Sequence, residues 1–307
     1  MATTTSITTT YAGEFAGQYV SAALLSGKTI ENGGITVKPN VKFKEVLKKV
    51  GTNDIVKDAT CDFDATSTIT LTEKVLQPEF QQVNLQLCKK DFISDWEAVQ
   101  MGFSAHHNIP PNFADFLISH VSAKVAQRTE TSIWAGATST NGQFDGFGTL
   151  LAADADLPSA NEVTGTTVTS SNVIAEIQKV SDAIPNAVYG AEDLKIYVSN
   201  KIAKAYNAAQ AALGYRDLYH AGTTELNFQG TPMFVAPGLG DDVMIAAETS
   251  NLYFGTGLLA DHNEVKVLDM SDLDGSDNVR VIMRFTAGVQ YGAVEDIVTY
   301  GITNSAN

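Results

Sequence analysis

The acids between Asp272 and Asp277 come nearest to a metal-binding pattern in this sequence. A calcium loop presents oxygen ligands at fixed alternate positions and ends in a glutamate that binds with both oxygens. This stretch, Asp-Leu-Asp-Gly-Ser-Asp, lacks a third acid before its glycine and has no distal glutamate. The incomplete ligand set predicts a turn between two strands.

The other candidates for acid–base or metal chemistry are His106, His107, His120, Asp241-Asp242 and Asp261-His262. Adjacent histidines rarely point at one metal ion, and His120 has no acid at helical spacing to act with it. The two pairs lie near glycines, but no Gly-x-Ser-x-Gly motif, Cys–His pair or zinc signature accompanies them. We therefore expect a protein that is not an enzyme, with no catalytic residue, metal ion or cofactor.

The charge balance limits the classes of function. Acidic residues outnumber basic ones 35 to 20 in 307 residues, and the net charge of −15 argues against nucleic-acid binding driven by charge. Bases gather from Lys42 to Lys57, whereas nine acids and one base, Lys266, lie between Asp241 and Asp277. This asymmetry fits copies joined head to tail, and it also fits two separate solvated faces.

Nothing in the sequence predicts export or a membrane anchor. Two cysteines, Cys61 and Cys88, make neither a disulfide framework nor a zinc site, which fits a reducing compartment. The N-terminus lacks the basic and apolar regions of a signal peptide, and no run approaches the ~20 apolar residues that span a bilayer. We expect a soluble protein made in the cytoplasm.

One long helix, predicted over Asn112–Ala135, must position much of the molecule. Large apolar residues recur at every fourth position, which is typical of one buried helix face: Phe113, Leu117, Val121 and Val125. Polar residues lie off this stripe: Asp115, Ser119, Ser122 and Glu130. About 24 residues give a rod of roughly 36 Å. Such a rod suits either an elongated subunit or the centre of an ordinary α+β domain.

The first eighty residues resemble an arm and a projecting hairpin more than a globular domain. Residues 1–10 are mostly threonine, and a short helix is predicted over Tyr11–Leu25. A brief helix is predicted over Lys44–Val50, followed by extended chain through Val75. We expect the segment from Val50 to Val75 to form a hairpin that projects from its own subunit.

The second half predicts an α/β layer followed by a strand-rich tail. Helices are expected over Asn172–Ile184 and from an Asn200 cap to Gly214. Strands are expected at Leu194–Val198, Leu226–Phe228, Met233–Val235, Met244–Ala246, Leu252–Phe254, Val265–Leu268, Val279–Thr286, Gly288–Tyr291 and Ile297–Ile302.

The order of these parts, together with four loose motifs, resembles the major capsid proteins of tailed bacteriophages, which have the Hong Kong 97-like (HK97-like) fold. The motifs are Ile133-Trp-Ala-Gly136 with Phe144-Asp-Gly-Phe-Gly148, Leu226 to Val235 around Gly230-Thr-Pro232, Asn251 to Gly257, and Val279 to Tyr300. The resemblance covers nearly the whole chain in order.

This resemblance implies an α+β fold with four named parts. They are an N-terminal arm at 1–40, an extended E-loop at 41–85, a peripheral domain at 86–160 with its spine helix at 112–136, and an axial domain at 161–250. Residues 251–307 would return as strands of the peripheral and axial domains. Some relatives crosslink an E-loop lysine to an asparagine, but no partner asparagine can be matched here.

The resemblance further implies a major capsid protein that self-assembles, as hexamers and pentamers of itself, into an icosahedral shell around a double-stranded DNA genome. The protein would be made and assembled in the host cytoplasm and reside in the virion capsid. Scaffold, portal and decoration proteins are possible partners, DNA would be enclosed without specific binding, and no membrane is involved.

Six residues of the arm and the hairpin are candidates for subunit interfaces: Tyr11, Phe15, Lys48, Lys49, Lys57 and Phe63. A two-stranded ribbon is marginal in water by itself and needs a surface. We expect the three lysines to meet the acid-rich Asp241–Asp277 region or a helix of another subunit. Two alternatives remain open: an encapsulin-like compartment shell, and a non-viral α+β enzyme or binding protein.

Overall fold

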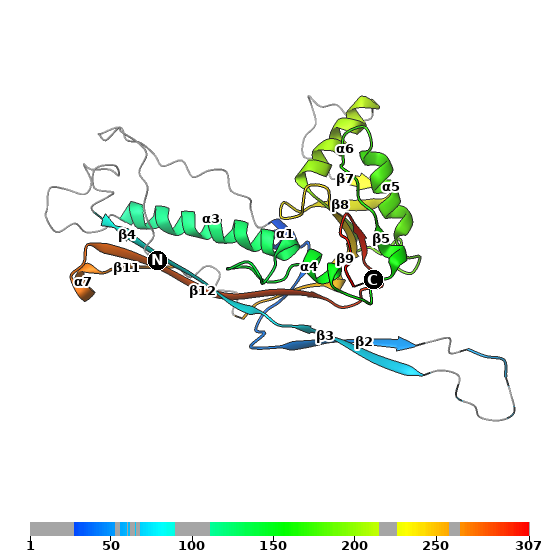
Figure 1. The fold of residues 1–307 in the computed structure, drawn as a ribbon, viewed down its shortest axis with the longest axis horizontal. Coiled ribbons are helices and arrows are strands. Elements are labelled where there is room, and N and C mark those ends of the chain that lie inside the picture. The colour runs from blue at the N-terminus through cyan, green and yellow to red at the C-terminus, as the bar shows by residue number, and fades with distance from the viewer. Residues whose placement is uncertain are drawn as a thin grey trace.

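The computed structural model describes residues 28–52, 56–59, 61, 65, 68–89, 111–214, 226–257 and 265–306, with backbone alone at 52, 111–117, 265 and 272. It has an elongated part, built on a long helix beside a long sheet, and a compact part at one end of that sheet (Figure 1). Within these ranges, every helix is too short or too polar to cross a membrane.

The long sheet is built on β12 (Asn278–Tyr291). Its strand order is β1 (Thr36–Lys38), β10 (Leu252–Gly255), β12 and β11 (Val265–Asp269), and β4 (Glu79–Cys88) also pairs with β12. The expected break between Thr286 and Gly288 is wrong. The strand is continuous because Gly288 pairs with Gly255 of β10, so the ladder of hydrogen bonds continues through it.

The predicted long helix is confirmed as α3 (Pro111–Ala135). It begins one residue earlier than expected, and proline suits a first helical position because its missing N–H has no partner there. Val121 and Val125 pack against Leu85 of β4 and Val281 of β12. Leu85 and Val281 lie on strands whose side chains alternate between the two faces of the sheet, so α3 covers the apolar face of the sheet.

The compact part is a six-stranded mixed sheet. Its order is β5 (Glu162–Val163), β13 (Val298–Tyr300), β9 (Met244–Glu248), β6 (Leu194–Val198), β8 (Thr231–Val235) and β7 (Leu226–Phe228). Helices α5 (Val173–Ala183) and α6 (Asn200–Ala212) pack on it through Ile177 and Ile202, both fully buried. The predicted cap of α6 is corrected by one residue: the Ser199 hydroxyl accepts the Ile202 N–H at 3.3 Å.

Short elements join these layers. They are α1 (Lys28–Glu31), α4 (Phe147–Ala152), α7 (Ser271–Asp274) and the single turns η2 (Ser159–Asn161) and η3 (Thr249–Asn251). Trp134 of α3 stacks near Phe147 of α4 and Tyr197 of β6, with ring centroids 5.4 and 4.9 Å away. The C-terminal end of α3 therefore ties the elongated part to the compact part.

A two-stranded ribbon extends away from both sheets (Figure 1). It consists of β2 (Glu45–Thr52) and β3 (Ile69–Leu76), paired antiparallel from Glu45–Leu76 to Thr52–Ile69. A projecting hairpin is present as predicted, but its first strand begins at Glu45, five residues before the expected start at Val50. The helix predicted over Lys44–Val50 is wrong, because these residues alternate between the two faces of the ribbon and pair with β3 along their length.

The ribbon joins the long sheet over two facing glycines, Gly255 and Gly288, which we call the glycine notch. Both are buried, and they pair in register. A Cβ on Gly255 would lie 2.9 Å from the Leu76 side chain, and one on Gly288 would lie 2.8 Å from the Gln77 carbonyl oxygen. The chain leaving β3 can therefore cross the sheet only because these two side chains are absent.

Candidate assembly surfaces

One face of the ribbon is apolar and exposed. Alternate residues of paired strands share a face, which places Val46 beside Val75, Val50 beside Leu71 and Thr52 beside Ile69. We call the five hydrophobic residues of this set the apolar face of the ribbon: Val46, Val50, Ile69, Leu71 and Val75. Leu71 and Ile69 are 70% and 71% exposed. Side chains of this kind gain free energy when a further surface covers them.

The opposite face of the ribbon is attached to its own subunit. Lys49 pairs with Glu295 at 2.5 Å, and Lys74 pairs with Asp154 at 2.6 Å. Leu76, at the end of β3, is fully buried in the notch. We call these contacts the ribbon base. They fix the root of the ribbon and leave its apolar face outward.

At the ribbon base, Lys74 and Tyr291 both donate hydrogen bonds to the Asp154 carboxylate. Burial alone would raise the pKa of its carboxyl, but hydrogen bonds from Lys74 and from the Tyr291 hydroxyl, each 2.6 Å, outweigh burial and lower the pKa. The pKa of Tyr291 is raised, first by burial and then by its bond to Asp154. The pKa of Glu295 is likewise lowered, because the bond from Lys49 outweighs partial burial.

Three of the six predicted interface residues lie in the described part of the chain, and their contacts with other copies stay predictions. Lys48 is exposed on the outward face, opposite Glu73 in register, and Lys57 is exposed beyond the end of β2. Lys49 lies on the inward face of the ribbon and pairs with Glu295 of its own chain, and its role at a subunit interface stays a prediction. The other three candidates, Tyr11, Phe15 and Phe63, lie outside the described residues.

Sequence reasoning missed Val46 and Val50 as surface residues because it assigned them to a helix. The signal that could have found them is alternation: in Glu45-Val-Leu-Lys-Lys-Val50, valines occupy two outward positions of one strand. It also missed Phe80 of β4, which is 85% exposed although its strand neighbours Gln81 and Val83 are partly covered.

A second attachment joins the start of the described chain to α3. Glu130 was predicted to lie off the apolar stripe, yet it is 1% exposed. Its carboxylate accepts the Thr29 N–H at 3.1 Å and the Thr29 hydroxyl, and Trp134 Nε1 donates to the same hydroxyl oxygen at 2.9 Å. We call residues 28–34, held here, the arm root. Burial raises the pKa of Glu130, and its hydrogen bonds oppose that rise only in part.

The acidic candidates for chemistry have structural roles where they are described. The Asp272–Asp277 stretch forms α7 and the turn between β11 and β12, as predicted. Asp242 pairs with Lys201 at 2.7 Å and accepts the Val168 N–H. His106, His107, Asp261 and His262 lie outside the described residues. In the described part of the chain, no three histidine, cysteine, aspartate or glutamate side chains come together as a metal site would need.

Comparisons with known proteins give a clear result only at the level of structure. No protein-family model matches the sequence, and no curated protein matches it. A chain from the capsid of a native GTA particle matches with a TM-score of 0.62 and 14% identity, over 94% of each chain. The capsid structure of cyanophage P-SCSP1u matches with a TM-score of 0.57 and 13% identity, over 96% of this chain and 94% of that one.

A chain of Mycobacterium phage Bobi gives the same result, with a TM-score of 0.55 and 15% identity over 96% and 95% of the two chains. What these pairs share at such identities is the fold. The resemblance to phage capsid proteins is thereby confirmed, and this chain has the mixed α+β fold of the proteins that form those capsids.

Proposed function

We propose that this chain is the shell protein of a phage capsid and that its copies join through the apolar face of the ribbon. The observation that carries the proposal is a projecting ribbon whose outward face exposes five hydrophobic side chains. A monomeric protein gains nothing from such a face, whereas a shell subunit can cover it with a neighbour. The fold shared with known capsid chains supports the same conclusion.

The low stability of an isolated two-stranded ribbon and its exposed apolar face favour contact with another protein surface. Two strands with no third strand beside them are marginal in water, and in the described part of the chain no second layer covers the apolar face of the ribbon. Lys48 and Glu73 interrupt the apolar face with one charge of each sign. Charges in that position give orientation more than affinity, which suits a repeated contact between identical subunits.

The finer parts of the proposal follow from the family resemblance. The shell is icosahedral, built from hexamers and pentamers, and encloses the double-stranded DNA of a tailed phage. Its four parts are the arm at 1–40, the E-loop at 41–85, the peripheral domain at 86–160 and the axial domain at 161–250, with return strands from 251 onward. The role is structural and not catalytic, and a net charge of −15 suits a shell that encloses DNA without gripping it.

The test is assembly of the purified chain with one substitution on each ribbon face. Leu71→Asp places a charge on the outward apolar face, and Thr70→Asp places the same charge on the adjacent exposed residue of the other face. We expect negative-stain micrographs to show shells for the parent chain and for Thr70→Asp, and none for Leu71→Asp. Shells formed equally by both variants would contradict the ribbon as the joint.

A compartment shell with the same fold is the second candidate. It would have the same ribbon but would enclose protein cargo. Particles isolated from their natural source decide between the two: DNA protected from nuclease supports the phage capsid, and a co-purifying enzyme without DNA supports the compartment. A purified chain that remains a monomer under all conditions would contradict both.

A further inference from the structure

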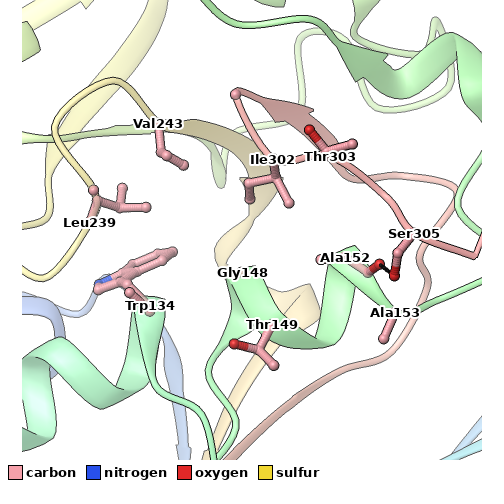
Figure 2. A pocket seen from close by; sticks show the side chains of 13 residues that line it. Trp134, Gly148, Thr149, Ala152, Ala153, Leu239, Val243, Ile302, Thr303 and Ser305 are labelled. Carbon is pink, nitrogen blue, oxygen red and sulfur yellow. Dashed lines mark hydrogen bonds between the residues drawn. The ribbon is translucent and has the colours of Figure 1, made fainter.

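An open apolar groove of about 520 Å³ lies where the C-terminal end of α3 meets α4, the 239–243 loop and the C-terminal segment 301–305 (Figure 2). Leu239 and Val243 line one side, and Ile302 and Ala152 line the other. None of the described residues that line this groove carries a charged side chain. Its chemistry therefore suits an uncharged, hydrophobic occupant.

Trp134 separates the groove from the arm root. Its Nε1 donates to Thr29, and Figure 2 shows the ring nitrogen turned away from Ile302 while the opposite edge of the ring faces the groove. The two sides of one indole therefore contact the fixed start of the described chain and the groove. A segment attached just before Lys28 therefore starts next to Thr29, which contacts the Trp134 side chain that lines the groove.

The chain that precedes Lys28 has the composition to fill this groove. Between Tyr11 and Leu25 it carries a single charged residue, Glu14, and aromatic residues at every fourth position: Tyr11, Phe15 and Tyr19. Tyr19 lies nine residues before Lys28, and nine residues can span up to about 30 Å. A tether this short gives its free end an effective concentration in the millimolar range, so even a weak contact is well occupied.

We propose that the groove is the docking site for residues 11–25 of the same chain, with Phe15 and Tyr19 placed beside Trp134. Aromatic rings gain from packing at an angle to one another beyond the area that they bury. The occupied groove would fix the arm on the joint between the elongated and compact parts of its own subunit. The proposal does not depend on assembly, so its failure would leave the proposed function standing.

Disulfide trapping in the full chain tests this. In a background of Cys61→Ser and Cys88→Ser, Gln18→Cys is combined with Thr303→Cys at the groove or with Leu273→Cys on α7, at the far end of the long sheet (Figure 1). We expect mild oxidation to link positions 18 and 303 within one chain and to leave 18 and 273 unlinked. Absence of the 18–303 link, or equal linking at both positions, would overturn the proposal.

Two further measurements keep the result specific. Replacing Phe15 and Tyr19 with alanine should lower the trapped fraction about fivefold or more if the rings are the anchors, and an unchanged fraction would contradict that role. Mixing chains that carry only Gln18→Cys with chains that carry only Thr303→Cys should give no linked dimers. Dimers as abundant as the intrachain product would assign the groove to the arm of another copy and overturn docking within one chain.

Discussion

The ribbon base and the arm root attach two segments to one subunit by different interactions: ion pairs at the ribbon base and buried hydrogen bonds at the arm root. At the ribbon base, Lys49 and Glu295 are both partly exposed, and Lys74, 28% exposed, reaches the Asp154 side chain, which is 9% exposed. At the arm root, a fully buried Glu130 accepts two hydrogen bonds from one threonine. Exposed ion pairs contribute about 0–1 kcal/mol and weaken in salt. A buried carboxyl is shielded from salt and costs several kcal/mol when its network is broken.

The comparison indicates that the ribbon can change its position relative to the subunit, whereas the arm root is held in one position. A segment held by partly exposed ion pairs can change its angle as conditions change. A segment held by a buried hydrogen-bond network stays in place until the surrounding core opens. Four substitutions or conditions test this difference, in order of decreasing expected effect.

The largest effect is expected from Glu130→Ala. The Thr29 N–H would remain buried without an acceptor and the Thr29 hydroxyl would lose its carboxyl partner, so we expect the free energy of unfolding to fall by roughly 2–5 kcal/mol. Urea unfolding of the unassembled chain measures this. Glu130→Gln keeps one acceptor oxygen and should lose less than half as much, and a loss below about 1 kcal/mol for the alanine variant would refute a buried anchor.

The second effect is a pH response of opposite sign at the two sites. The folded state raises the pKa of Glu130, so its neutral form is favoured, and stability at the arm root increases as pH falls through the raised pKa. The folded state lowers the pKa of Asp154 and Glu295, so their contribution is full above the ordinary carboxyl pKa and is lost as pH falls through the lowered values.

Urea unfolding of matched variants at several pH values measures how stability depends on pH at each of the two sites. The unfolding free energy of the parent, measured relative to that of Glu130→Gln, should increase as the pH is lowered from 8 to 5. The difference between the parent and Asp154→Asn should hold over that range and shrink below about pH 4. Two curves that move in the same direction would show that the sites do not differ as described.

The third effect is screening by salt. Asp154→Asn removes the charge that Lys74 meets while it keeps an oxygen for the Tyr291 hydroxyl, so we expect a loss of about 1 kcal/mol at low ionic strength. At about 1 M salt the Debye length is ~3 Å, so part of this loss should disappear. The rest should remain, because Asp154 is only 9% exposed and partly buried pairs are screened less. The loss caused by Glu130→Gln should not depend on salt, and a matching decrease there would contradict burial of the carboxyl.

The smallest effect is expected at the outward face. Lys48 has an exposed side chain on the face turned away from its subunit, so Lys48→Gln should change the unfolding free energy of the unassembled chain by less than about 0.5 kcal/mol. The same substitution should lower the yield of shells if the outward face meets a neighbour. A large loss of stability in the free chain would show that Lys48 belongs to the base.

Periodicity predicted the elements that fold by local rules. The four-residue stripe of α3 and the apolar faces of α5 and α6 were visible because one helix face must be buried wherever the helix lies. Most strands of the six-stranded sheet were predicted from short β-branched runs between glycines and prolines. The order of these parts was also enough to indicate the shared fold.

The errors concern residues whose partners are distant in sequence. Glu130 is buried because donors arrive from Thr29, 101 residues earlier, and nothing on the helix itself reveals them. The segment Lys44–Val50 is a strand because Ile69–Leu76 lies beside it. Lys49 and Lys48 look alike in sequence, and only the pairing register assigns one to the base and the other to the outward face.

The glycine notch gives the ribbon a fixed point about which it can turn. Leu76 is fixed where the ribbon crosses Gly255 and Gly288, and the other seven residues of β3 extend about 23 Å beyond it at ~3.3 Å per residue. A rotation of ten degrees at this pivot would carry the far end of the strands through about 4 Å, close to the spacing between neighbouring strands. Copies of one chain could therefore adapt to differently curved regions of a closed surface by small rotations at two residues that have no side chains.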